Sequence, residues 1–269
     1  MKPFGGALRH LYLSALDLSD APERRKQMIP PRTMNFVGDG DFHGTGHEFK
    51  NLFIDYGHLR PDHRVLDVGC GIGRMAVPLT GYLSAKGRYE GFDIVKKGID
   101  WCQQNIAQKF PNFHFQHSDV ENRYYNPKGT QKAATYGFPF ADESFDFVFL
   151  TSVFTHMFRP DLENYLKEVV RVLATDGTGF ITFFLLNQES DGRIQRRESH
   201  LDFSHLIEGG LTTTPENPEE AIAYPESDVR ALFQSCQFQI AEPIRYGFWS
   251  GKPRSQSLTF QDVVIATKI

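Results

Sequence analysis

Cysteine is scarce in this sequence, and the few cysteines it contains are far apart. Only Cys70, Cys102 and Cys236 occur among the 269 residues. An odd number of widely spaced thiols suits a reducing compartment better than a disulfide framework, and no two are close enough in sequence to form a zinc-binding pair. The sequence therefore predicts a cytoplasmic protein without a structural metal.

Long apolar runs and an excess of positive charge are also missing. No segment reaches the roughly 18 continuous apolar residues that a membrane-spanning helix needs. The stretch Leu8 to Leu18 is broken by Arg9, His10 and Asp17. The 33 acidic residues outnumber the 29 Lys and Arg, so the formal net charge is −4. We therefore expect no membrane span and no nucleic-acid partner, because the chain offers no overall basic surface.

Short apolar runs alternate with longer amphipathic segments through most of the chain after residue 60. This alternation is typical of a parallel sheet with helices on both faces. We expect strands at residues 64–68, 88–93, 112–116, 145–150 and 179–185, and helices at residues 47–61, 73–84, 97–109, 159–173 and 226–236. Two final runs, at residues 238–246 and 259–267, would complete a seven-stranded α/β sheet.

The segments outside this alternation are expected to be an N-terminal extension and insertions of a single main domain. Residues 1–60, with a helix at 8–18, are predicted to form an N-terminal helical cap, and residues 61–269 the main domain. Insertions are expected at about residues 121–140 and 187–225. Substrate choice often lies in such surface segments.

Two groups of aromatic residues lie in or near these segments. Tyr124 and Tyr125 belong to the first insertion, and Phe248 and Trp249 lie near the end of the run at 238–246. The first pair is compatible with either a pocket for a substrate or a solvated surface loop. The second pair is compatible with either a stacking surface or ordinary core packing. Neither pair is included among the candidate site residues.

The strongest local pattern is a buried strand that runs directly into a glycine-rich turn and a helix. It reads Val65-Leu66-Asp67-Val68-Gly69-Cys70-Gly71-Ile72-Gly73-Arg74. Glycine at alternate positions permits backbone conformations closed to other residues and lets a ligand approach without a Cβ in the way. The turn is therefore a candidate site for a flat, polar cofactor. The alternative is a tight strand-to-helix turn with a structural role only.

An acidic residue ends the next predicted strand. Asp93 lies about twenty residues after the glycines, where a carboxylate can accept hydrogen bonds from both hydroxyls of a ribose. These two features would also suit a nicotinamide dinucleotide. However, the dinucleotide fingerprint has the spacing Gly-x-Gly-x-x-Gly, and here Arg74 takes the place of its last glycine. A nicotinamide-dependent oxidoreductase is therefore disfavoured.

The order and spacing of several motifs between residues 65 and 185 resemble the class I S-adenosylmethionine-dependent methyltransferases. The glycine-rich turn resembles the first motif of that family, and Gly91-Phe92-Asp93 resembles the acidic motif after it. The resemblance continues through residues 117–120, 145–152 and 165–177. It implies a Rossmann-like, seven-stranded, mostly parallel sheet with helices on both faces. It also implies S-adenosylmethionine as cofactor and S-adenosylhomocysteine as product.

The resemblance further implies a set of cofactor-binding residues. They are Asp67, Gly69, Cys70, Gly71, Gly73, Arg74, Asp93, Ile94, Asp119, Val120 and Thr151. Asp93 would hold the ribose. Asp119 matches the position at which the family has an aspartate near the adenine amino group.

Methyl transfer from a sulfonium needs mainly an aligned acceptor and exclusion of water, because the methyl group is already activated. We expect a small molecule or a saccharide as acceptor, methylated at oxygen rather than nitrogen. A hydroxyl acceptor benefits from a general base, and His156, just past the strand at 145–150, is the catalytic candidate. The alternative is that His156 packs against or caps the following helix.

The residues after the strand at 145–150 argue against two related chemistries. Thr151 and Ser152 stand where metal-dependent members have carboxylates, so no catalytic metal is expected. The run Thr-Ser-Val-Phe replaces the Asn/Asp-Pro-Pro-aromatic tetrad of enzymes that methylate DNA bases or glutamine. A second hypothesis of another class is a non-catalytic S-adenosylmethionine-binding regulatory or interaction module. An occluded or featureless acceptor cavity would favour it.

Overall fold

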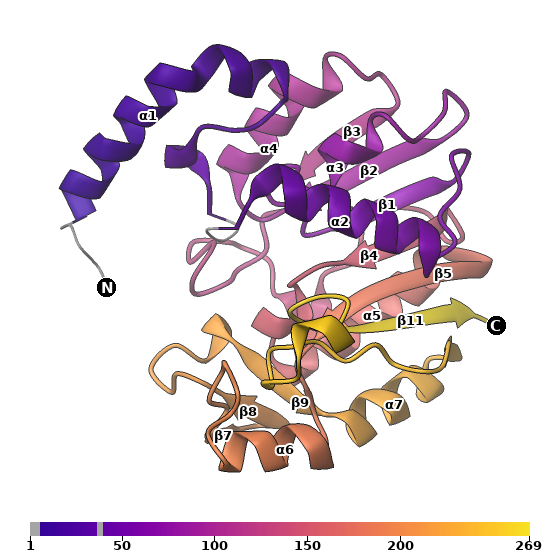
Figure 1. Cartoon of the computed structure of the whole chain (residues 1–269). Coiled ribbons are helices and arrows are strands. Elements are labelled where there is room, and N and C mark those ends of the chain that lie inside the picture. Colours follow the sequence, from indigo (N-terminus) through magenta and orange to yellow (C-terminus); the bar gives the residue numbers. More distant parts are fainter. Residues whose placement is uncertain (1–5, 37–39) are drawn as a thin grey trace.

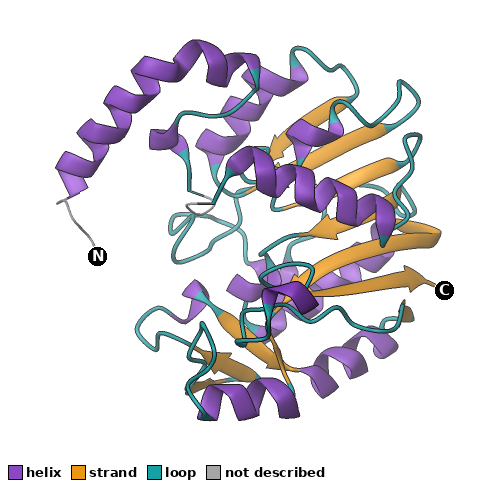
Figure 2. Cartoon of the chain, viewed as in Figure 1, coloured by secondary structure: helices purple, strands orange, loops and turns teal. Residues whose placement is uncertain are grey.

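A seven-stranded sheet with helices on both faces forms the main part of the chain (Figures 1 and 2). The computed structural model describes residues 6–36 and 40–269, with side chains from residue 11 onward. The strands are β1 (Arg64–Val68), β2 (Arg88–Asp93), β3 (Phe113–His117), β4 (Phe145–Leu150), β5 (Leu173–Phe183), β10 (Phe238–Ile240) and β11 (Asp262–Lys268). Their order is β10-β11-β5-β4-β1-β2-β3, and only β11 runs antiparallel to its neighbours. The expected seven-stranded, mostly parallel sheet is confirmed.

Strand side chains alternate between two hydrophobic cores because successive residues of a strand point to opposite faces of the sheet. In β4, Val148 and Leu150 enter one core, and Phe147 and Phe149 enter the other. Residues of α5 (Arg159–Val172) and α7 (Glu226–Ser235) complete the first core. Residues of α2 (Phe42–Asp55), α3 (Ala76–Leu79) and α4 (Lys96–Cys102) complete the second. Both faces of the sheet are therefore covered, as the predominantly apolar strands predict.

Strands β1, β2 and β4 have the predicted bounds, and β3 is displaced by one residue. The strand predicted at 179–185 is present, but its bounds are wrong. The strand β5 begins earlier, at Leu173, and stops at Phe183, while β6 (Leu185–Leu186) belongs to a second sheet. The strand predicted at 238–246 is also too long, because β10 ends at Ile240 and Pro243 has no N–H to donate to a sheet.

The helix predicted at 73–84 is the largest error among the helices. Only Ala76–Leu79 is α-helical, because Pro78 cannot donate a backbone hydrogen bond and Gly81 follows soon after. Helix α2 covers residues 42–55 rather than 47–61, since the Asp41 side chain accepts a hydrogen bond from the His43 N–H and caps it earlier. The helix predicted at 97–109 is α4 followed by a π-helical turn, η2 (Gln103–Ala107).

The N-terminal helix α1 (Gly6–Lys26) extends beyond the predicted helix at 8–18 and projects away from the sheet (Figure 1). It is tied to the short helix η1 (Arg32–Met34) by the Asp17 carboxylate, which accepts hydrogen bonds from the N–H groups of Arg32 and Thr33 at 2.7 and 3.0 Å. Helix α2 instead packs in the core. The assignment of residues 1–60 to a separate N-terminal cap remains a prediction. No helix in residues 6–36 and 40–269 is both long and apolar enough to span a membrane.

The segment predicted as a polar insertion at 187–225 contributes to a second, four-stranded sheet. Its strand order is β6-β9-β8-β7, with β7 (His205–Ile207), β8 (Gly210–Thr212) and β9 (Ile222–Pro225). Helix α6 (Gln188–Gln195) and the short helix η5 (Pro218–Glu220) accompany it. Phe184, Phe203 and Trp249 form a small separate core here. This layer lies beside the main sheet on the side of β5 and β11 (Figure 2).

Candidate functional site

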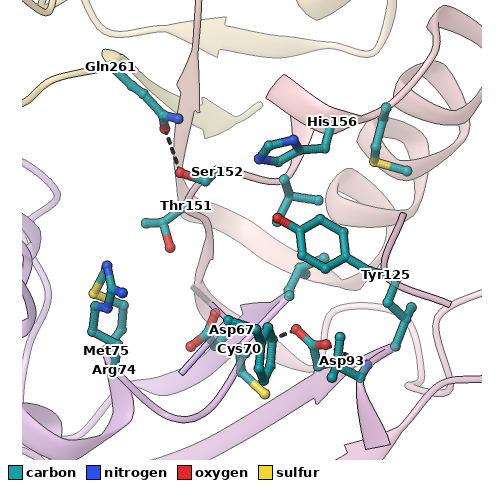
Figure 3. A pocket seen from close by; sticks show the side chains of 18 of the residues that line it. Asp67, Cys70, Arg74, Met75, Asp93, Tyr125, Thr151, Ser152, His156 and Gln261 are labelled. Atoms are coloured by element: carbon teal, nitrogen blue, oxygen red, sulfur yellow. Dashed lines mark hydrogen bonds between the residues drawn. The ribbon is translucent and has the colours of Figure 1, made fainter. Parts of the chain in front are cut away.

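A cavity of about 570 Å³ lies at the carboxyl ends of β1, β2 and β4. In open parallel sheets, ligands bind in the crevice outside these ends, and the volume is in the range of small-molecule sites. The turn after β1 and the ends of β2 and β4 form one side (Figure 3). Residues of α2, the insertion after β3, the short helix η4 (Phe154–His156), α5, η5 and the segment before β11 also line it.

The glycine-rich turn has a backbone conformation that explains its composition. Gly69, Gly71 and Gly73 have positive φ angles of 77°, 58° and 78°, which side-chain-bearing residues rarely adopt. A Cβ at Gly69 would also lie 2.6 Å from the Val153 side chain. Gly69 and Gly71 line the cavity, whereas Gly73 packs toward Ile106. The turn therefore presents backbone rather than side chains to this part of the cavity.

Asp93 is buried at the end of β2, and its carboxylate braces the turn. Its Oδ2 accepts a hydrogen bond from the Gly71 N–H and its Oδ1 from the Val95 N–H, both at 2.7 Å. Burial raises the pKa of Asp93, and these N–H groups act in the opposite direction. A carboxylate offers about four acceptor positions, so two remain for a ligand. This position suits a pair of vicinal hydroxyls.

Asp67 is a buried carboxylate with an unused oxygen. The Tyr89 hydroxyl donates to its Oδ2 at 2.5 Å, while its Oδ1 has no hydrogen-bond partner in the part of the chain that the structure describes. Burial raises the pKa of Asp67 to about 8, and the nearby Asp93 adds to the rise. Because a buried acceptor without a donor is costly, this oxygen fits a ligand that brings a donor or a positive charge.

His156 lies in η4 and lines the same cavity. Its Nδ1 is 2.8 Å from the main-chain oxygen of Glu219, and because a carbonyl can only accept, Nδ1 carries the proton. Burial lowers the pKa of His156, so the ring is neutral at pH 7 with its lone pair on Nε2. The Tyr125 ring meets it edge-on at a centroid distance of 5.8 Å. The imidazole thus both packs against η5 and faces the cavity (Figure 3).

Ser152, directly after β4, has a backbone conformation that is unusual for serine, with φ of 58°. Its N–H donates to Thr182 Oγ1 at 2.8 Å, and its hydroxyl donates to Gln261 Oε1 at 3.0 Å. These bonds connect the end of β4 to β5 and to the segment before β11. The described residues contain no group of three or more His, Cys, Asp or Glu side chains placed to hold a metal ion.

Most of the predicted site residues meet at this cavity. Those that line it are Asp67, Gly69, Cys70, Gly71, Arg74, Asp93, Ile94, Val120, Thr151 and His156. Gly73 and Asp119 do not line it. The Asp119 carboxylate accepts hydrogen bonds from Thr130 Oγ1 at 2.7 Å and Asn126 Nδ2 at 3.3 Å, which lower its pKa. Its role beside the adenine stays a prediction.

Sequence reasoning missed part of the cavity wall. The additional residues include Tyr125, Glu219, Phe248, Arg254, Phe260 and Gln261. Tyr125 and Phe248 were noted in the sequence only as aromatic residues, each compatible with a structural or a ligand-binding role. The others carry no motif, because long-range folding brings them to the site and no local pattern marks it.

A family model described as a methyltransferase domain matches residues 65–177. Among curated proteins, the chain is 27% identical over 210 residues to an uncharacterized methyltransferase of Bacillus subtilis. That match covers 74% of this chain and 68% of the relative. Two further curated methyltransferases are matched over only 39% and 35% of their own length.

Solved structures share the fold at low sequence identity. A Pyrococcus horikoshii protein superposes with a TM-score of 0.58 at 17% identity, covering 88% of this chain and 95% of that chain. The 1,6-didemethyltoxoflavin-N1-methyltransferase of Burkholderia thailandensis was solved with 1,6-didemethyltoxoflavin and S-adenosylhomocysteine bound. It has a TM-score of 0.52 at 15% identity, with 100% of this chain and 92% of that chain covered. At these identities the likeness concerns the fold.

Proposed function

Because the chain is a class I S-adenosylmethionine-dependent methyltransferase, we propose that it methylates an oxygen atom of a small molecule or a saccharide beside His156. The observation that carries the proposal is a buried, neutral imidazole at the cavity wall. Its Nδ1–H is committed to the Glu219 carbonyl, so Nε2 is the basic atom. A hydroxyl is a weak nucleophile at neutral pH, and such a base would activate it.

S-adenosylmethionine is the cofactor, and the residues at the strand ends fit it. The backbone of the glycine turn leaves room for close approach, and Asp93 has acceptor positions left for the ribose hydroxyls. The unpartnered Oδ1 of Asp67 would stabilise positive charge on the ligand. Ile94 and Val120 would contact the adenine. The other candidates along the same cavity are Gly69, Cys70, Arg74 and Thr151.

When bound, S-adenosylmethionine would supply a methyl group that the positive charge on its sulfur activates for transfer to the acceptor oxygen. The proton displaced from the acceptor hydroxyl passes to Nε2 of His156. The Glu219 carbonyl stabilises the resulting imidazolium through Nδ1–H, and keeps the ring oriented. The insertion after β3 and the segment before β11 line the cavity and would limit access of water to bound ligands.

A non-catalytic module would be favoured by a closed or featureless acceptor region. The region beside His156 instead holds the polar groups of Tyr125, Ser152 and Gln261 together with open volume. These groups could orient a polar acceptor.

The experiment is an acceptor screen that measures S-adenosylhomocysteine formation, followed by identification of the methylated atom by mass spectrometry and NMR. Calorimetric titration with S-adenosylmethionine, S-adenosylhomocysteine and a nicotinamide dinucleotide comes first. We expect the two adenosyl ligands to bind with Kd values on the order of micromolar and the dinucleotide not to bind. We expect the product to carry its new methyl group on oxygen.

His156→Gln should leave cofactor affinity intact and reduce turnover by roughly a hundredfold or more. His114→Gln is the matched control, because His114 lies exposed on β3 and does not line the cavity. A product methylated on nitrogen, or equal turnover of the two variants, would contradict the proposal.

A further inference from the structure

One side of the cavity is formed by residues of the segment that leads into β11. We call it the C-terminal wall and define it as Phe248, Arg254, Phe260 and Gln261, all of which line the cavity. The Phe248 and Phe260 rings lie 5.1 Å apart at an angle of 73°. The Arg254 guanidinium lies 5.3 Å from the centre of the Phe248 ring. The wall therefore combines two aromatic rings with one cation.

Arg254 differs from the arginines that hold the fold together. Arg159 pairs with Glu163 and Asp228, and Arg230 pairs with two glutamates. Arg254 has no carboxylate within ion-pair distance among the residues that the structure describes, and its side chain is exposed. The Arg254 side chain makes no hydrogen bond to another residue in the described part of the chain, so its N–H groups are available to a ligand. Arginine can bind a carboxylate with two parallel hydrogen bonds.

Gln261 adds hydrogen-bond donors to the same wall. Its Oε1 accepts from the Ser152 hydroxyl, which assigns the other end of the amide as the NH₂ group. No acceptor for this NH₂ group occurs in the described ranges of the chain. Figure 3 shows Gln261 beside Ser152, with the nitrogen end of its amide turned toward the side of the view where His156 lies. An acceptor molecule would thus meet donors on the C-terminal wall and a base on the His156 side.

We propose that the methyl acceptor is a planar aromatic molecule that carries a carboxylate, with its ring against Phe248 and Phe260 and its carboxylate on Arg254. This inference rests on the proposed function, because it describes the acceptor of the same reaction. Phe260 is 36% exposed and therefore has a ring surface left for stacking. The hydroxyl to be methylated would lie toward His156.

The charge of the wall selects a carboxylate over a phosphate. One guanidinium balances a single negative charge, whereas a phosphate monoester carries about −1.5 to −2 at neutral pH. Apart from the cofactor candidates, four carboxyl groups line the cavity: Glu48 from α2, Glu121 from the insertion after β3, Asp161 from α5 and Glu219 from η5. None of them belongs to the C-terminal wall. Burial raises the pKa of Asp161 and of Glu219, which favours their neutral forms.

Hydrogen bonds to Asp262 hold the C-terminal wall in place before any ligand binds. Its Oδ1 accepts from the Gly247 N–H at 2.7 Å. Its Oδ2 accepts from the Leu185 N–H at 2.7 Å and from the Trp249 Nε1–H at 2.8 Å. These bonds flank Phe248 on both sides and fix the start of β11 next to Gln261. A preorganised wall loses little conformational entropy on binding.

The test is calorimetric binding of simple phenols to the complex with S-adenosylhomocysteine, in which no methyl transfer can occur. The probes are 4-hydroxybenzoate and 4-hydroxycinnamate, the methyl ester of each, and 4-hydroxyphenyl phosphate. We expect each carboxylate to bind at least about tenfold more tightly than its own ester and than the phosphate. We expect Arg254→Gln to weaken carboxylate binding by roughly 10- to 100-fold and to change ester binding by less than about twofold.

Lys252→Gln is the matched control. Lys252 lies two residues away, and its ammonium likewise sits over an aromatic ring, at 5.4 Å from the centre of Tyr246, but it does not line the main cavity. The variant should bind every probe as the wild type does. Equal binding of acids and esters, tighter binding of the phosphate, no carboxylate binding below about 1 mM, or equal effects of the two variants would overturn the inference.

The binding experiment tests the acceptor class separately from the proposed function. Binding of the probes requires only the acceptor cavity and S-adenosylhomocysteine. If carboxylates bind through Arg254 while His156→Gln leaves turnover unchanged, the role of His156 is refuted and the acceptor class stands. If His156→Gln abolishes turnover while carboxylates show no advantage over esters, the acceptor class is refuted and the proposed function stands.

Discussion

The Nδ1 atom of His156 lies 2.8 Å from the main-chain oxygen of Glu219, although the two residues are 63 positions apart in the sequence. His156 follows β4 of the main sheet, and Glu219 belongs to the segment that builds the second sheet. The bond fixes which imidazole nitrogen carries the proton. The second sheet therefore acts on the chemistry of the site through a main-chain carbonyl.

The first prediction concerns the pH dependence of turnover. Burial lowers the pKa of His156 below its usual 6.5, so the basic form is present at pH 7 and is lost only as pH falls through that lowered value. The rate with a neutral hydroxyl acceptor should be flat around pH 7 and should decline only below pH 6.5. Rate measurements from pH 5 to 8 would test this, with His156→Gln expected to lose the acidic limb. If the rate of the variant still falls at low pH, a titratable group other than His156 causes the decline.

A second prediction concerns cofactor affinity. With its pKa raised to about 8, Asp67 is largely protonated at pH 7 in the free protein. A positively charged sulfonium favours the ionised form, so binding releases a proton and affinity rises with pH until about pH 8. S-adenosylhomocysteine, whose sulfur is neutral, should show a weaker dependence in calorimetric titrations at several pH values. Asp67→Asn should remove the difference between the two ligands, and identical profiles in the wild type would refute the assignment.

Asp93 and Asp119 should differ in their effect on the cofactor. Asp93→Ala should weaken S-adenosylhomocysteine binding by roughly 1 to 3 kcal/mol, because it removes charge-assisted bonds to the ribose. Asp119→Ala should weaken it less, since the Asp119 carboxylate is engaged by Thr130 and Asn126 and does not line the cavity. Parallel titrations of the two variants would decide. A larger loss in Asp119→Ala would restore that residue to the adenine site.

Gly69 should tolerate no side chain. Gly69→Ala places a Cβ at a positive φ and 2.6 Å from Val153, so we expect lower stability and much weaker cofactor binding. Gly81→Ala is the control, because a Cβ there meets nothing within 4 Å. Urea unfolding and cofactor titration would compare them. The double variant Gly69→Ala with Val153→Ala should recover only part of the loss, since it relieves the contact but not the backbone strain.

The sheet was predictable from the sequence where local pattern and long-range structure agree. The strands β1, β2 and β4 are short segments rich in apolar and aromatic residues that end at or just before a glycine or polar residue, and their bounds were correct. The prediction failed where a single residue sets the end of a helix, or where a partner distant in sequence sets the sheet to which a strand belongs. Pro78 shortens the helix after the glycine turn, and Leu185 leaves the main sheet because β9 is available to pair with it.

The cofactor side of the site was more predictable than the acceptor side. Asp67, Gly71 and Asp93 lie in two short motifs at neighbouring strand ends, so sequence order alone places them together. Gln261 and Arg254 reach the cavity only because β11 inserts between β5 and β10 and its leading segment folds back over β4. No local sequence pattern predicts that these residues reach the cavity.

The position of β11 also sets an order for assembly during synthesis. The strand β5 pairs with β4 on one side and with β11 on the other, and the N–H of Leu185, two residues past its end, donates to Asp262, 77 positions later in the chain. While the ribosome makes the intervening residues, the glycine turn and β1 to β4 can already associate, but β5 has an open edge. The emergence of residues 262–268 closes that edge and completes the C-terminal wall in the same event. A nascent chain stalled before this point would be able to form the cofactor turn but would have no acceptor wall, and would expose an unpaired strand to aggregation.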